Sequence, residues 1–112
     1  MDKTRKEVHK MKECCNTYLD EQFAGDAEVV NEIYNEYVAS AKIKLGEAQT
    51  ALAGKDWKSL DKIAHTIKGN ALSAGDEEMA QTAIALRSAT SLQDDGTATG
   101  LVARLGELST LL

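Results

Sequence analysis

Apolar residues recur at spacings of three and four along most of this chain, which is the pattern of amphipathic helices. The clearest example spans about residues 57–73, and its apolar positions are Leu60, Ile63, Ile67 and Ala71. Because each residue advances about 100° around a helix, His65 lies roughly opposite this stripe and faces water. The stretch therefore predicts a helix that packs one side inward and displays an imidazole on the other.

Four further helices are predicted by the same periodicity, over residues 3–22, over about 26–53, from about 76 onward, and at the end of the chain. Their apolar positions are, in chain order, Val8, Met11, Cys15, Tyr18 (or Leu19) and Gln22; Val30, Ile33, Tyr37, Ala41, Leu45, Ala48 and Leu52; Met79, Ala80, Ala83, Leu86 and Thr90; and Leu101, Leu105, Leu108 and Leu112. The first stripe is thin, so its helix either caps the others or packs on a second copy. The helix over 26–53 is roughly 40 Å long, the length of a bundle strut.

Glycine and aspartate mark the first boundaries between these helices. Gly25 suits a helix end, and Asp26 and Asp56 are expected to cap the amides of the helices that follow them. Trp57 is free to pack across the bundle end.

The later boundaries follow the same chemistry. Gly75 ends the helix that carries His65, and the acidic run 76–78 opens the next one, where negative charge complements the positive end of the helix dipole. This placement accounts for all three acidic residues without metal ligands. Thr97 or Asp95 is the expected cap of the last helix, which Gly100 and Gly106 weaken.

Composition favours a single all-α domain over residues 1–112. The chain is 43% hydrophobic and contains no proline, which would break helix interiors. Its length suffices for one core and not for two. Amphipathic helices with short links predict an up-and-down antiparallel four-helix bundle with an additional N-terminal helix.

The charge of the chain is unevenly distributed. The net charge of −5 disfavours nucleic acid, whose phosphates need clustered cations. Residues 13–41 carry seven acidic side chains and no lysine or arginine, whereas residues 42–68 carry six lysines against Glu47, Asp56 and Asp61. The approach to His65 is therefore locally basic, which points to an acidic partner surface.

Neither a secretory signal nor a run of membrane-spanning length is evident, so we expect a soluble, cytoplasmic protein that does not bind membranes. Cys14 and Cys15 are adjacent, which matches no zinc spacing and would strain a disulfide. We interpret both as reduced thiols. His9 lies among lysine and glutamate and is interpreted as a solvated side chain.

The face around His65 carries the candidate chemistry. Lys68 lies one turn onward and supplies a cation, and Gly69 removes a side chain where a partner would approach. No phosphate-binding loop, metal-ligand spacing or nucleophile elbow is present, which disfavours a self-contained enzyme. An exposed imidazole can instead carry a phosphoryl group covalently. The residues expected to dock a partner are Lys58, Asp61, Lys62, Gly69 and Leu72.

The segment 64–75, AHTIKGNALSAG, resembles the histidine-containing phosphotransfer (HPt) domain of multistep two-component phosphorelays. It matches the alanine–histidine pair, the lysine–glycine pair three residues later and a second glycine ten positions after the histidine. The resemblance covers about residues 19–112 and leaves 1–18 as an N-terminal helical extension. Asn70, Leu72 and Met79 depart from the residues that are usual in the family.

This resemblance implies a carrier whose His65 accepts a phosphoryl group from a receiver-domain aspartate and passes it to another. Lys68 would stabilise the phosphoryl charge. The chain would bind no cofactor, because the receiver brings Mg²⁺, and the partners would be receiver domains and a hybrid sensor histidine kinase. Two alternatives remain open: a phosphorylation-independent adaptor or inhibitor that binds receivers through the same face, and a dimerisation module built on residues 3–22.

Overall fold

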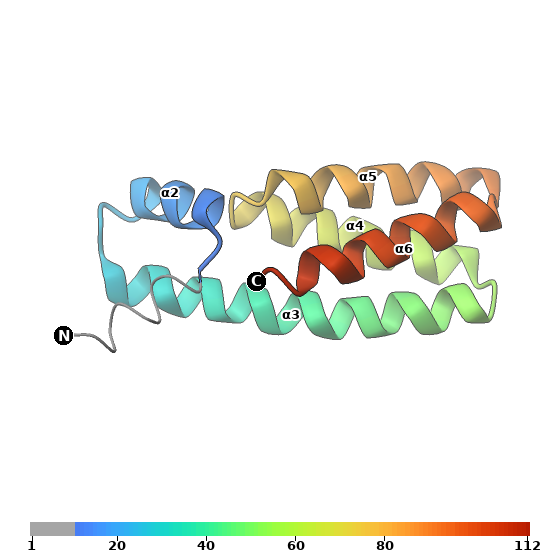
Figure 1. Ribbon diagram of the computed structural model, residues 1–112, viewed down its shortest axis with the longest axis horizontal. Coiled ribbons are helices and arrows are strands. Elements are labelled where there is room, and N and C mark those ends of the chain that lie inside the picture. Colours follow the sequence, from blue (N-terminus) through green and yellow to red (C-terminus); the bar gives the residue numbers. More distant parts are fainter. Residues whose placement is uncertain (1–10) are drawn as a thin grey trace.

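The computed structural model describes residues 11–112, and this part of the chain is helical without strands (Figure 1). Its helices are α2 (Glu13–Gln22), α3 (Ala27–Ala53), α4 (Trp57–Ser73), α5 (Glu77–Leu92) and α6 (Asp95–Ser109). The all-α prediction is confirmed, and the predicted bounds of α3 and α4 agree closely with the structure. Val8 and His9 lie outside the described residues.

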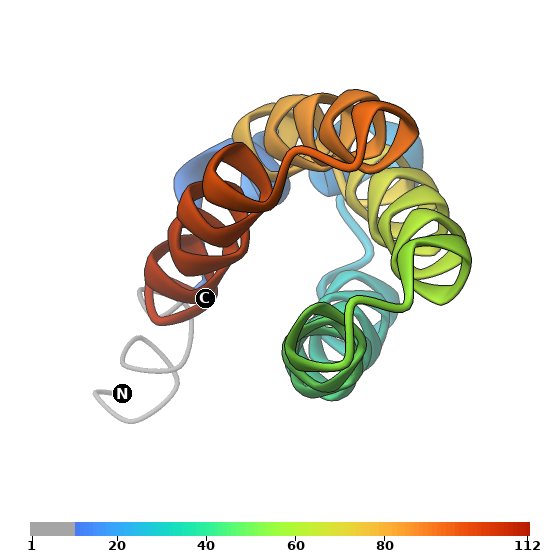
Figure 2. The ribbon, with the colours of Figure 1, turned by 90° about the vertical axis from the view of Figure 1, so that its right-hand side faces the viewer.

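The helices α3 to α6 run in alternating directions along the long axis of the molecule (Figure 1). Seen end-on, they follow one another in chain order around that axis (Figure 2). Each packs on the next, α3 also packs on α6, and the most extensive contact is between α4 and α5. The short links favour this order, because a short link holds each helix next to the one that follows it in the chain.

The predicted apolar stripes supply most of the core, but Gln22 of the first stripe is exposed. In α4 the buried side chains are Leu60, Ala64, Ile67 and Ala71, while Ile63 is half-buried at the edge of the stripe. All five predicted positions of α5 are buried. Leu105 and Leu108 of α6 are fully buried, and burying one such side chain stabilises a fold by about 1.5–3 kcal/mol.

An aspartate precedes each of the helices α3 to α6 and accepts a hydrogen bond from a backbone amide three residues later. Asp26 and Asp56 were the predicted caps. The prediction for the last helix was wrong, because its cap is Asp94 rather than Thr97 or Asp95. Asp94 accepts from the Thr97 amide at 3.1 Å and from the Thr97 hydroxyl at 2.7 Å, so Thr97 is the donor to the cap.

Helix α2 lies alongside the start of α3, next to the turn that joins α4 to α5 (Figure 1). Its side chains Cys15 and Leu19 are fully buried, whereas Tyr18 is partly exposed, so Leu19 is the residue of the stripe that packs inward. Tyr18 instead packs against Gly75, whose φ of +77° and lack of Cβ permit the approach: a Cβ there would overlap the tyrosine. Of the two predicted roles, α2 therefore caps its own bundle.

A buried polar cluster holds this contact together. Asp76 is fully buried, and its carboxylate accepts hydrogen bonds from Lys12 Nζ at 2.8 Å and from the Tyr37 hydroxyl at 2.7 Å. The Lys12 amide in turn donates to the Tyr34 hydroxyl at 3.1 Å. All three acidic residues lie at the start of α5 as predicted, Asp76 as its cap and Glu77 and Glu78 in the first turn, but Asp76 also has a distant partner, Lys12, that was not predicted.

The cluster should make stability sensitive to alkaline pH. Burial raises the pKa of the Cys15 thiol above its usual 9.0, and burial together with the Asp76 hydrogen bond raises the pKa of Tyr37 above 10.0. Burial is the largest single influence on Lys12 and opposes its charge, but the hydrogen bond to Asp76 and the nearby negative charges together outweigh it and raise the pKa above 10.5. Groups with raised pKa values stabilise the fold below their unfolded values and lose that contribution as pH rises. We expect the free energy of unfolding, measured by urea titration, to fall progressively from about pH 9 upward.

A Tyr37→Phe variant provides the control, because it removes one of the protons involved. Its free energy of unfolding should fall less steeply over the same alkaline range. A parent protein equally stable at neutral pH and well above pH 10 would contradict this account.

Two further expectations concern the whole chain. Cys14 is exposed, Cys15 is buried, and both are free thiols, as predicted. Over residues 11–112, no helix combines the length and the apolar character that a membrane span requires.

Candidate functional site

Helix α4 presents His65 to solvent. Its neighbours Ala64 and Ile67 are buried in the core, which fixes the rotation of the helix and leaves the imidazole on the exposed side. Asp56 caps the helix through the Ser59 amide at 3.2 Å, so the register of α4 is set from its first turn. The predicted outward placement of His65 is confirmed.

The other predicted site residues lie along the same helix. Lys68 is half-buried, Gly69 is exposed, and the Leu72 side chain is 48% exposed. A Cβ at Gly69 would meet nothing within 4 Å, so the helix is open to a close approach there. Lys62 is also exposed, while Lys58 lies two turns before His65, roughly 10 Å along the axis and thus farther from the ring.

The nearest charged partner of His65 comes from α5 and was not predicted. Arg87 Nη1 lies 3.0 Å from His65 Nδ1, and Arg87 Nε donates to Asp61 Oδ1 at 3.0 Å. A second, longer bond joins Arg87 Nη2 to Asp61 Oδ2 at 3.4 Å. Asp61 therefore does not pair with the histidine directly; the guanidinium lies between the two.

The ion pair sets the charge state of this group. The Arg87 hydrogen bond is the largest cause that lowers the pKa of Asp61, so its carboxylate is ionised at neutral pH. Both side chains are partly exposed, at 38% and 41%, and ion pairs in contact with water add little to stability. Its effect is therefore local: it holds the guanidinium against the imidazole.

A hollow of about 330 Å³ lies between α4 and α5 beside these groups. It is lined by Asp61, Lys68, Ile84, Arg87, Ser88 and Ser91. Two cations, two hydroxyls, one exposed apolar side chain and the Asp61 carboxylate, which pairs with Arg87, thus border a space next to the imidazole. This lining suits an anionic group such as phosphate.

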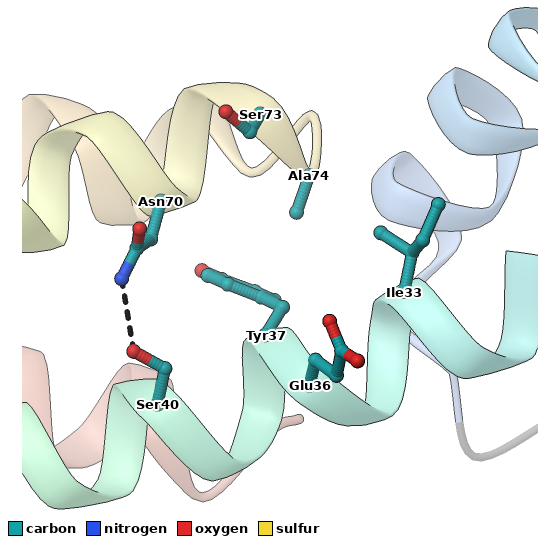
Figure 3. A pocket seen from close by; sticks show the side chains of 7 residues that line it. All are labelled: Ile33, Glu36, Tyr37, Ser40, Asn70, Ser73 and Ala74. Carbon is teal, nitrogen blue, oxygen red and sulfur yellow. Dashed lines mark hydrogen bonds between the residues drawn. The ribbon is translucent and has the colours of Figure 1, made fainter.

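A second hollow, of about 260 Å³, lies between α3 and α4 (Figure 3). There the Asn70 amide points to Ser40 and donates to its hydroxyl at 2.9 Å. Asn70 is five residues after His65, about 140° around the helix, so this hollow is on another side of α4. Its polar contact ties α4 to α3 and adds nothing to the group around His65.

Arg87 was not predicted as a site residue, because its partners Asp61 and His65 are distant in the chain. A signal for it nevertheless exists. In an antiparallel pair of helices, residues at similar distances from the connecting turn lie side by side. His65 is ten residues before Gly75 and Arg87 is twelve residues after it. Counting outward from the turn would have placed the two side chains together.

Within residues 11–112, no group of three or more histidine, cysteine, aspartate or glutamate side chains is arranged to hold a metal ion. The cations around the imidazole are side chains, Lys68 and Arg87. Such a surface can neutralise part of the charge of a phosphoryl group.

Comparison with known proteins identifies the family. The Hpt domain family matches residues 32–111, which is more than half of the chain and extends from within α3 to just beyond α6. The sequence resemblance starts at about residue 19, but the family match starts only at residue 32, so α2 lies outside the match. Neither the comparison with curated proteins nor that with solved structures gives a match. With its exposed histidine on α4 and this match, the chain belongs to the Hpt domain family.

Proposed function

We propose that this protein is a phosphorelay carrier, in which His65 accepts a phosphoryl group from one receiver-domain aspartate and passes it to another. Hpt domains are phosphocarrier modules of two-component phosphorelays, without kinase activity of their own, and they interact with receiver domains and histidine kinases. The packing of α3 to α6 supports the up-and-down four-helix bundle expected of such a module.

The observation that carries the proposal is the open side of the imidazole. Nδ1 of His65 is occupied by Arg87, so Nε2 is the nitrogen left to react. Once the Nε2 proton has moved to Nδ1, the Nε2 lone pair would form the N–P bond while the P–O bond breaks and leaves its electrons on the aspartate. Lys68, which borders the same hollow as Arg87, would stabilise charge on the phosphoryl oxygens.

Docking would use the exposed side chains around this group. Gly69 lets the partner backbone approach, Leu72 offers apolar contact, and Lys58, Lys62 and Asp61 lie toward the start of α4. The receiver would contribute Mg²⁺, and the first phosphoryl donor would be a hybrid sensor histidine kinase. A carrier needs transient docking, which a small mixed surface of this kind favours.

The direct test is transfer from phosphorylated receivers. Incubation with each phosphorylated receiver domain of the source organism should label the protein, and the label should be acid-labile and base-stable. If several receivers bind the protein and none labels it, the carrier assignment fails and the adaptor reading replaces it.

A Gly69→Gln substitution should weaken receiver binding by about tenfold or more, because a long side chain would fill the space that the partner approaches. The fold should not suffer, since a Cβ at Gly69 meets no neighbour and glutamine favours helix over glycine. Titration of a labelled receiver gives the affinity.

Gly100→Gln on α6 is the matched control, because a Cβ there also meets nothing within 4 Å. It should bind receivers like the parent protein. Equal affinities for all three proteins would refute the close-approach argument.

A further inference from the structure

The contact between Arg87 and His65 fixes where the ring proton lies. A guanidinium has donors and no acceptor, so Nδ1 of His65 must accept the hydrogen bond that Arg87 Nη1 makes at 3.0 Å. In a neutral imidazole the proton is then on Nε2. The contact thus assigns the ring proton to Nε2 and places the guanidinium over Nδ1.

Other contacts hold the guanidinium in this place. The Asp61 carboxylate accepts from Arg87 at 3.0 and 3.4 Å and from the Thr90 hydroxyl at 3.3 Å. The Thr90 hydroxyl also lies 2.7 Å from the Arg87 carbonyl, and Thr90 is buried. Two bonds to a planar group orient it, so Nη1 is directed at the imidazole.

The proton on Nδ1 decides how readily phosphohistidine gives up its phosphoryl group. When the N–P bond breaks, its electron pair goes to Nε2. The ring then departs as neutral imidazole only if Nδ1 already carries a proton; without that proton it would depart as an imidazolate anion, a poor leaving group. The guanidinium donor at 3.0 Å occupies the Nδ1 lone pair to which that proton would bind.

We infer that Arg87 is a positioning residue that preserves the phosphorylated form of His65 by keeping Nδ1 unprotonated, with Asp61 as its anchor. The inference rests on the proposed function. Release then requires the guanidinium to leave Nδ1, and the acidic pocket of a docked receiver offers it competing carboxylates. Acceptance of a phosphoryl group also requires the guanidinium to leave Nδ1, because the Nε2 proton must move to Nδ1 before Nε2 can attack.

The experiment uses chemical labelling, so that no receiver is needed. All proteins carry His9→Gln, which leaves His65 as the single histidine. They are phosphorylated with phosphoramidate, freed of reagent, and followed for loss of phosphohistidine at neutral pH. Arg87→Ala should lose its label about tenfold faster, the effect of one hydrogen bond from a charged donor at an exposed site. Asp61→Asn should fall between this variant and the parent.

Three comparisons separate this role from a structural one. Arg104→Ala makes the same change of net charge on α6, where Arg104 pairs with Glu78 and Glu107, and should leave the lifetime unchanged. Arg87→Lys, which keeps a cationic donor, should restore part of the lifetime, and Arg87→Gln less.

The pH dependence supplies the third comparison. Asp61 and Lys68 of α4 are the other charged side chains that line the hollow with Arg87. They remain in the Arg87→Ala variant, so a change in its profile reports the guanidinium. The pH at which loss accelerates should be lower in the parent than in Arg87→Ala, because the guanidinium opposes protonation of Nδ1.

Equal lifetimes and equal pH profiles for the parent and Arg87→Ala would overturn the inference, as would failure of the reagent to label either protein. Labelling of Arg87→Ala alone would support it, since the same hydrogen bond keeps a proton on Nε2. A failure of the proposed function has a different signature: chemical label forms with the expected lifetimes, but no phosphorylated receiver transfers its phosphoryl group to the protein.

Discussion

A His65→Gln variant is expected to take no label from any phosphorylated receiver that labels the parent protein. Glutamine has no nucleophilic nitrogen, so no N–P bond can form, and transfer should fall below detection rather than merely slow. The helix should persist, because His65 is exposed and its buried neighbours Ala64 and Ile67 are unchanged. Receiver-dependent labelling, resolved by gel and counted against the parent, measures the effect.

The chain offers a matched control in its other histidine. His9→Gln makes the same chemical change outside α4 and should be labelled as fully as the parent. The circular dichroism of both variants should equal that of the parent. Labelling of His65→Gln at the parental level would show that another group carries the phosphoryl, and the carrier assignment to His65 would be wrong.

An Asp76→Ala variant is expected to lose about 3–5 kcal/mol of stability, the range found when one partner of a buried ion pair is removed. The substitution leaves the ammonium of Lys12, whose side chain is only 15% exposed, without its near carboxylate and with only Glu78 Oε1 at 4.0 Å. It also deprives the Tyr37 hydroxyl of its acceptor and α5 of its cap. Urea denaturation of both proteins at neutral pH gives the difference.

Asp56→Ala separates the contributions, because Asp56 caps α4 as Asp76 caps α5 but is exposed. It removes a cap alone and should destabilise the protein much less. A Lys12→Met substitution in the Asp76→Ala background should recover part of the loss, since it removes the unpaired charge. If Asp76→Ala costs no more than Asp56→Ala, the buried pair is not what holds α2 in place.

The helices were predictable because their signals are local. The buried stripe of α4 repeats every three to four residues, and so does that of α5, so the side of each helix that faces the core can be read from the sequence. The outward placement of His65 follows from the same periodicity. Tyr34 was missed in α3 because it adjoins Ile33, and periodicity alone does not choose between neighbouring apolar residues.

The contacts that give the site its character depend on tertiary structure. In the sequence, Asp76 looks like an ordinary carboxylate at the start of a helix. Its buried ion pair depends on Lys12, which is 64 residues away in the chain. Arg87 likewise looks like a solvated side chain of α5 until α4 lies beside it. The spacing of charged residues along the chain does not indicate which residues they pair with. These two ion pairs could therefore be identified only from the packed helices.

The anchoring of α2 has a consequence for where the domain begins. The family match starts at residue 32, yet Cys15 and Leu19 fill the end of the core. Lys12 also neutralises the Asp76 carboxylate, which is buried away from water. A fragment trimmed to the matched region would expose that apolar end and leave the Asp76 carboxylate without Lys12. The cooperative folding unit therefore extends upstream of the matched segment, at least to Lys12.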